Sequence, residues 1–161
     1  MKNKYFFYFF IFFSLFFSKL LLADELDISS SKIKVDKETK IVTLEGDIVV
    51  IDSKNNKVFS EKAKYQKEKK LIETFGYTKI ITSEGYQLIG ENVYFDDENK
   101  IISSSEPTKI IDKEGNEIFV KMFKYLINKN MFFSRGKIEI KDINNNNYKF
   151  YEIYIDEKKK K

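Results

Sequence analysis

The stretch KIVTLEGDIVVID, residues 40–52, alternates apolar and polar residues as a strand does, yet it carries Gly46 at its centre. Such alternation predicts a β-strand with one buried face. A glycine inside a strand gives up side-chain packing and adds backbone entropy that folding must remove. The pattern returns along the chain, which indicates that the glycine is a requirement of the fold.

The chain repeats itself every thirty residues without insertion or deletion. Five columns of residues stay apolar at this spacing, although only 42% of the chain is hydrophobic. The columns are Ile28, Val58, Leu88, Ile118, Tyr148; Ile33, Ala63, Val93, Phe123, Ile153; Val35, Tyr65, Phe95, Tyr125, Ile155; Val42, Ile72, Ile102, Phe132; and Val50, Ile80, Ile110, Ile140. A period of this length is typical of stacked repeat architectures.

Polar turns recur about every fifteen residues, with Gly85, Gly115, Asn55 and Asn145 in one column. Gly and Asn accept the positive φ of tight turns. The short loops imply that successive strands are antiparallel neighbours. The sequence therefore predicts an all-β antiparallel meander of about nine strands. Five are of a first kind, typified by residues 57–66, and four of a second kind, typified by residues 70–82.

Both kinds of strand carry a predicted bend. In the first kind the apolar parity changes near residues 61–62, which predicts a β-bulge. In the second kind the mid-strand column holds Gly46, Gly76, Glu106 and Gly136. We expect this column to face inward, where a Cβ would collide across the fold, and to crease the sheet over an apolar interior. Glu106-Pro107 departs from the rule.

The termini predict export. Residues 1–23 form a predicted signal peptide: Lys2 and Lys4, an apolar stretch at 5–17, and Ala23 before the acidic Asp24. An uncleaved membrane anchor is the alternative. Residues 24–156 form the predicted domain, and 157–161 a basic turn or tail where the chain could be truncated. Of the net charge of +4, the leader's lysines supply three, so the charge gives little support to nucleic-acid binding.

The composition argues against most catalytic and metal sites. The chain has no Cys, His or Trp, so a disulfide framework, a zinc site and a His general base are excluded, and we expect no cofactor. A carboxylate enzyme using Asp96, Asp97 and Glu98 is an alternative, but a solvated polar turn explains these residues better. We therefore expect no enzymatic activity.

The phrases SSKIKVDKETKIVTLEGDIVVI (residues 30–51) and SEKAKYQKEKKLIETFGYTKI (residues 60–80) resemble the OstA-like domains of the lipopolysaccharide transport (Lpt) machinery. That family includes the periplasmic bridge protein LptA, the N-terminal domain of the outer-membrane protein LptD and the anchored LptC. The resemblance covers about residues 27–156. Its pattern is met by Ala63 and Tyr65, Val93 and Phe95, Phe123 and Tyr125, and by the strands around Gly46, Gly76 and Gly136.

The resemblance implies a V-shaped β-jellyroll in the periplasm, whose groove carries the acyl chains of lipopolysaccharide toward the outer membrane. It also implies edge-to-edge joining with other Lpt jellyrolls, and with LptE if the chain is part of LptD. We expect the N-terminal domain of LptD, with LptA or an LptC-like protein as alternatives. A structural or adhesive envelope protein is a further alternative.

The groove-lining residues expected on this basis share the inward face. They are Val42, Leu44, Ile48, Val50, Tyr65, Ile72, Ile80, Phe95, Ile102, Ile110, Tyr125, Phe132, Ile138 and Ile140. Small inward residues such as Thr74, Ser104 and Ser134 are expected to leave room for lipid chains. In the alternative, aromatic side chains fill that room and the interior is simply a core. The last strand, 149–155, is expected to present a free edge to a partner, unless the lysines after it shield that edge.

Overall fold

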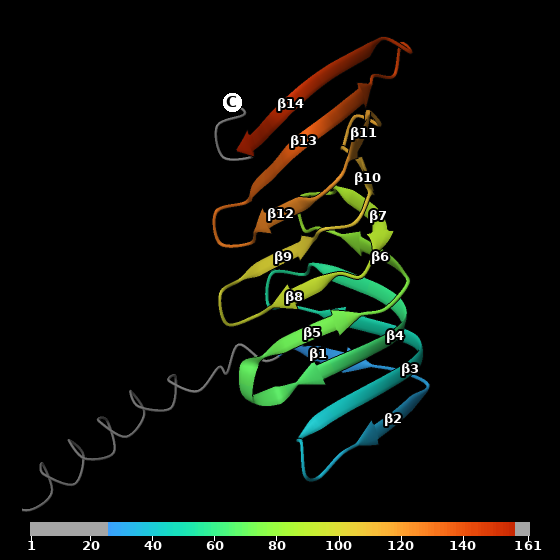
Figure 1. Ribbon diagram of the computed structural model, residues 1–161, viewed down its shortest axis with the longest axis vertical. Coiled ribbons are helices and arrows are strands. Elements are labelled where there is room, and N and C mark those ends of the chain that lie inside the picture. The colour runs from blue at the N-terminus through green and yellow to red at the C-terminus, as the bar shows by residue number, and fades with distance from the viewer. Residues whose placement is uncertain (1–25, 157–161) are drawn as a thin grey trace, which may run out of the picture.

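The computed structural model describes residues 26–156, whose regular structure is strand apart from one short 3-10 helix, η1 (Lys67–Lys69) (Figure 1). The strands are β1 (Asp27–Ser29), β2 (Lys32–Val35), β3 (Ile41–Ile51), β4 (Lys57–Gln66), β5 (Leu71–Thr74), β6 (Tyr77–Ile81), β7 (Gln87–Glu91), β8 (Tyr94–Asp96), β9 (Ile101–Ser104), β10 (Thr108–Ile111), β11 (Glu117–Val120), β12 (Phe123–Leu126), β13 (Met131–Lys141) and β14 (Asn147–Asp156). The predicted leader and the predicted tail lie outside the described residues. Within 26–156, no helix is long and apolar enough to cross a membrane.

The strands form one antiparallel sheet of 14 members, and the prediction of an all-β antiparallel fold is confirmed. The nine predicted segments appear in the predicted order. Five of them are interrupted at their centre, so that each is recorded as two strands: β1 and β2, β5 and β6, β7 and β8, β9 and β10, β11 and β12. The interruptions coincide with the predicted crease.

The crease divides the sheet into two wings that share the long strands β3, β4, β13 and β14 (Figure 1). Between β4 and β13, wing 1 consists of β5, β8, β9 and β12, and wing 2 consists of β6, β7, β10 and β11. Side chains alternate across a strand, so each wing turns one face inward. The inward faces meet in a single hydrophobic core that extends from β3 to β13.

The extra residue at the crease lies in the glycine-bearing strand, so the predicted bulge near residues 61–62 was placed in the wrong strand. Glu45 of β3 pairs with Lys62 of β4, and Ile48 pairs with Ser60. Two residues of β3 therefore lie opposite one residue of β4. The change of parity in β4 is real, because Ser60 and Ala63 are both buried. It follows from the bulge in the partner strand.

The crease glycines are required by backbone conformation, and the predicted collision is wrong at Gly76 and Gly136. At Gly46 a Cβ would lie 3.1 Å from Ser31 Cβ, in the segment paired beside it. Gly46, Gly76 and Gly136 have φ of +73°, +73° and +105°. This left-handed region is disfavoured for residues with a Cβ, and a glycine there is typical of one class of β-bulge. A Cβ at Gly76 or Gly136 would meet no heavy atom within 4 Å. Gly76 is exposed, so the column does not face inward throughout.

Glu106 creases the sheet by another route. It is not among the residues with positive φ. Its amide donates to Ser104 Oγ at 3.0 Å, and its carbonyl accepts a hydrogen bond from Thr108 Oγ1 at 3.0 Å. Two inward hydroxyls thus hold the backbone between β9 and β10. This arrangement brings Thr108 of β10 close to Gly90 of β7. A Cβ at position 90 would lie only 2.6 Å from Thr108 Oγ1.

Candidate functional site

The fourteen predicted groove residues all come together between the wings. Eleven are buried in the core, and Val42, Tyr65 and Ile140 are partly buried against it. The sequence did not single out Tyr86 and Ile127, which are also buried in this core although they lie in or beside turns. Their only signal is that Ile127 is apolar in a column that is otherwise charged, and that Tyr86 shares with Leu26 a column that otherwise holds asparagines.

The interior is packed. The largest fully buried side chains include Phe95, Phe123 and Leu44. Between the wings near Tyr86 and Tyr125 there is a cavity of only about 10 Å³, which is at the lower limit for one water molecule. An acyl chain can therefore enter this interior only if the wings move apart.

The small polar residues of the inward face do not leave open space, contrary to the sequence-based expectation. Thr74 Oγ1 accepts a hydrogen bond from the Val93 amide at 2.9 Å. Ser104 Oγ donates to the Glu91 carbonyl at 2.8 Å, and Ser134 Oγ donates to the Met122 carbonyl at 2.7 Å. Buried backbone groups need such partners where a strand ladder is interrupted. These hydroxyls therefore satisfy the backbone at the crease.

Within the described residues, the interior is uncovered in one wing at each end of the sheet, whereas Ile28, Ile153 and Ile155 in the other wing pack against the core. On β2, Ile33 and Val35 are 57% and 59% exposed, and on β14, Tyr148 and Phe150 are 45% and 49% exposed. Residues of the same columns in the middle repeats are buried, for example Val120 in the column of Phe150. The end residues face inward by register, and within residues 26–156 no further strand covers them.

Both ends also have unpaired strand edges within the described residues. β14 pairs with β13 alone, and β1 and β2 each pair with β3 alone. The free edge of β14 is ten residues long, whereas the other end of the sheet has two short strands. A free edge offers backbone donors and acceptors to another strand.

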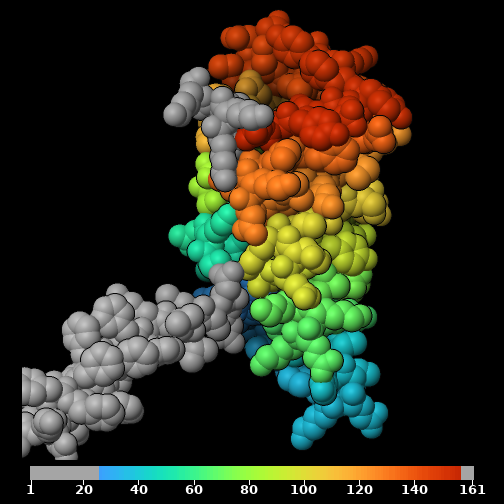
Figure 2. Space-filling model, turned by 90° about the vertical axis from the view of Figure 1, so that its left-hand side faces the viewer, coloured from blue at the N-terminus to red at the C-terminus, as the bar shows by residue number. Residues whose placement is uncertain are grey.

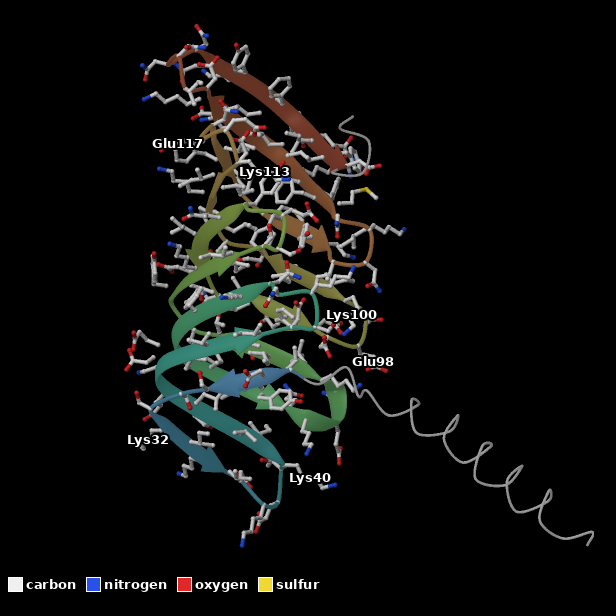
Figure 3. All side chains as sticks on the ribbon, turned by 180° about the vertical axis from the view of Figure 1, so that it is seen from behind. Lys32, Lys40, Glu98, Lys100, Lys113 and Glu117 are labelled. Atoms are coloured by element: carbon white, nitrogen blue, oxygen red, sulfur yellow. The ribbon has the colours of Figure 1, made fainter. Side chains whose placement is uncertain are left out.

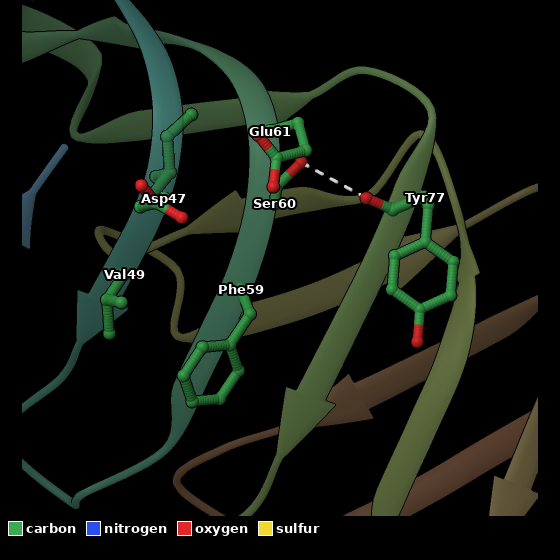
Figure 4. Close-up of a pocket in the computed structure, with 7 residues that line it drawn as sticks. Asp47, Val49, Phe59, Ser60, Glu61 and Tyr77 are labelled. Atoms are coloured by element: carbon green, nitrogen blue, oxygen red, sulfur yellow. Dashed lines mark hydrogen bonds between the residues drawn. The ribbon is translucent and has the colours of Figure 1, made fainter. Parts of the chain in front are cut away.

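A hollow of about 250 Å³ lies beside the crease, on the wing 2 side, where it opens on the outer face of β3 and β4 (Figure 4). Val49 and Phe59 contribute apolar surface, and Asp47, Glu61 and Tyr77 lie around them. Asp47 Oδ2 accepts a hydrogen bond from Ser31 Oγ at 2.9 Å. The hollow is separate from the interior, since outward-facing side chains supply most of its lining.

The three acids considered for catalysis lie in one turn, which Asp96 and Asp97 stabilise. Asp96 accepts hydrogen bonds from the amide and the side chain of Asn99, at 2.9 and 2.8 Å. Asp97 is buried and pairs with Lys100 at 2.7 Å, so it is not the solvated residue that the sequence suggested. Glu98 and Lys100 lie in the same turn between β8 and β9 (Figure 3). Among residues 26–156 no group of three or more potential ligands could hold a metal ion.

Comparison with known proteins supports the fold. No protein-family model matches the chain, and no curated protein matches its sequence. Among solved structures, it is similar to LptH of Pseudomonas aeruginosa, the LptA-homologous periplasmic component of the lipopolysaccharide transport device. The TM-score is 0.60 at 12% sequence identity, over 70% of this chain and 82% of that chain. The resemblance found in the sequence is thus confirmed at the level of the fold.

Proposed function

We propose that the chain is a periplasmic lipopolysaccharide-transport module without enzymatic activity, which holds the acyl chains of the lipid between its wings. The observation that carries this proposal is the apolar interior that runs from β2 to β14 and, within the described residues, is partly uncovered at both ends, in a fold similar to that of LptH. A sealed core would not expose inward-facing Ile33, Val35 and Phe150 at its two ends.

The apolar ends also fit a role in a chain of jellyrolls. All segments of the first kind run in the same direction, because each is separated from the next by one antiparallel segment. Placing β14 of one domain against β1 and β2 of the next would therefore make a parallel contact. In wing 1, Ile33 and Val35 of β2 would then continue the columns of Ile153 and Ile155 of β14, and in wing 2 Tyr148 of β14 would continue the column of Ile28 of β1. The apolar interior would thus extend from one domain into the other.

For the particular component, the sequence resemblance favours the N-terminal domain of LptD at the outer membrane, with LptE as a further partner. The similarity to LptH over most of that chain favours an LptA-type periplasmic bridge as the second candidate. An anchored LptC-like protein is the third. All three roles use the same interior and the same strand edges.

A photoreactive phenylalanine analogue tests lipid carriage. Placed at Tyr125 or Phe132, which face inward, it is expected to capture purified lipopolysaccharide on irradiation. Placed at Phe119, which is 41% exposed on the outer face of β11, it is expected to capture little. Equal capture from both faces, or none from either, would contradict the proposal. No capture with a packed interior would favour the structural or adhesive alternative.

A further inference from the structure

The wings meet a second time on the side away from the crease, where three turns come together. Turns 52–56 and 82–86 belong to wing 2, and turn 127–130 belongs to wing 1. We name this meeting line the seam. Figure 2 views the molecule from this side, with turn 52–56 in teal beside the orange residues of turn 127–130.

Side chains bridge the seam at two places. Lys54 Nζ donates a hydrogen bond to the carbonyl oxygen of Ile127 at 2.8 Å, although the two residues are 73 positions apart. Asn130 Nδ2 donates to Glu84 Oε1 at 2.9 Å. Glu84 is also 3.5 Å from Lys113 Nζ, in the next turn of wing 2. The seam is therefore held by polar side chains that reach from turn to turn.

The seam differs from the crease in what would have to break for the wings to separate. At the crease, β3, β4, β13 and β14 continue from one wing into the other. Among the described residues, strand pairing does not cross the seam. Opening the seam therefore breaks side-chain contacts and exposes core, whereas opening the crease would break the chain's own sheet.

Some of the aromatic residues of the core lie close to the seam. Tyr86 is the last residue of turn 82–86, Ile127 is the first residue of turn 127–130, and Tyr125 precedes that turn at the end of β12. Tyr86, Tyr125 and Phe132 also line the small interior cavity. Lys113 Nζ lies 5.9 Å from the centre of the Tyr86 ring. Separation of the turns would thus uncover part of the apolar interior.

We infer that the seam is the lateral entry for acyl chains and that Lys54 and the Asn130–Glu84 pair are the clasps that keep it closed. This inference rests on the proposed function. The packed interior has no room for a chain until the wings part, and the seam is where they part without disrupting the sheet. An entering lipid keeps its anionic headgroup outside, at the level of the turns.

Binding of the headgroup favours the open state. In the closed seam, the Lys54 ammonium bonds to a neutral carbonyl. An anionic oxygen of the headgroup is a stronger partner for an ammonium than a carbonyl is. A ligand shifts a conformational equilibrium only through its differential affinity for the two states. Exchange of the Ile127 carbonyl for the headgroup provides that difference.

A covalent lock tests the entry path, and the absence of Cys from the chain makes the lock unique. The variant Glu84→Cys/Asn130→Cys is joined across the seam by a short, cleavable bis-maleimide. The control is Glu73→Cys/Tyr94→Cys, joined in the same way on the outer face of wing 1, where Tyr94 Oη lies 2.9 Å from Glu73 Oε1. Both variants carry the photoreactive residue at Phe132, and purified lipopolysaccharide is the probe.

The expected result is at least a tenfold loss of lipid capture in the locked seam, with recovery after cleavage, and no loss in the locked control. Equal capture with the seam locked and unlocked would overturn lateral entry while leaving lipid carriage intact. Absence of capture even from the unlocked protein would overturn the proposed function, and the inference with it.

A second measurement needs no lipid. The reaction rate of a maleimide with Ile110→Cys, which lies beside the interior cavity and is 1% exposed, reports how often the interior opens. Adding Lys54→Met is expected to raise this rate severalfold. Adding Lys64→Met, on the outer face of β4, is expected to leave it unchanged. An unchanged rate with Lys54→Met would show that Lys54 does not hold the seam.

Discussion

Gly90 and the hydroxyl of Thr108 are so close that a Cβ at position 90 would lie 2.6 Å from Thr108 Oγ1. Gly90 does not have a positive φ, so steric contact alone makes glycine necessary there. Gly90→Ala is expected to lower the free energy of unfolding by about 1–3 kcal/mol, as overpacking does. Urea denaturation measures this loss. Adding Thr108→Ala should recover part of it, and simple additivity of the two losses would contradict the steric explanation.

Gly76 is required for the opposite reason, since it has open space and a positive φ. Gly76→Val is expected to cost about 2 kcal/mol or more, because a left-handed backbone is disfavoured for L-residues, and most for β-branched ones. Gly76→Asn should cost less, since Asn tolerates this region. Glu73→Val, in the neighbouring strand, should change stability by less than about 0.5 kcal/mol. Equal losses for Val and Asn would contradict a conformational cause.

The turns after β3 and β13 carry the same aspartate motif in different surroundings. Asp52 accepts hydrogen bonds from the Asn56 amide and side chain at 2.8 and 2.7 Å, and both residues are buried. Asp142 makes the equivalent contacts with Asn146, but Asp142 is only half-buried and Asn146 is exposed. Asp52→Ala is expected to cost about 2–3 kcal/mol, and Asp142→Ala much less, because only the first leaves buried groups unpaired. Thermal and urea unfolding of the two variants give the comparison.

The same turn makes a prediction about pH. The hydrogen bond from the Asn146 side chain, followed by backbone amides, holds the pKa of Asp142 below the ordinary aspartate value of 3.8. A carboxyl with a lowered pKa in the folded state contributes stability above its unfolded pKa and loses it as pH falls through the folded value. The NMR signal of the Asn146 side-chain amide should therefore titrate with a midpoint below 3.8. A midpoint above it would show that these bonds do not favour the charged form.

Val120 and Phe150 occupy one column of the repeat but differ in exposure, at 4% and 49%. Val120→Lys is expected to cost about 3 kcal/mol or more, because it buries an unpaired charge. Phe150→Lys should cost less than about 1 kcal/mol, because the end of the sheet is open. The same variant should weaken joining to a second jellyroll, measured by cross-linking. A large loss of stability in both variants would mean that the end is covered.

The sequence predicted the fold well because positions that stay apolar in every thirty-residue repeat are the positions that face inward. Ile72 and Ile102, which share one apolar column, are both buried, as the alternation along their strands predicted. It located the crease at Gly46 but not its cause, since a collision and a positive φ both select glycine. It misread Thr74 and Ser104 because apolar patterning does not show which backbone groups an interrupted ladder leaves to be satisfied.

The seam was beyond sequence reasoning. The contact of Lys54 with Ile127 joins turns 73 positions apart, a separation that is not a multiple of the repeat. This contact depends on how the twist of the sheet and the stagger of its strands displace one wing relative to the other. The local sequence pattern does not specify that displacement. Tyr86 and Ile127 were missed for the same reason, since they are buried by the opposite wing.

The shared strands of the two wings make the domain extensible. Each repeat of thirty residues adds one segment of the first kind and one of the second, and both segments run through the two wings. The cross-section of the molecule therefore stays the same. With neighbouring strands about 4.8 Å apart, duplicating one repeat lengthens the molecule by roughly 10 Å and deleting one shortens it by the same step. Duplication or loss of one repeat in the gene would therefore change the length of the molecule in fixed steps and leave the packing of the interior unchanged.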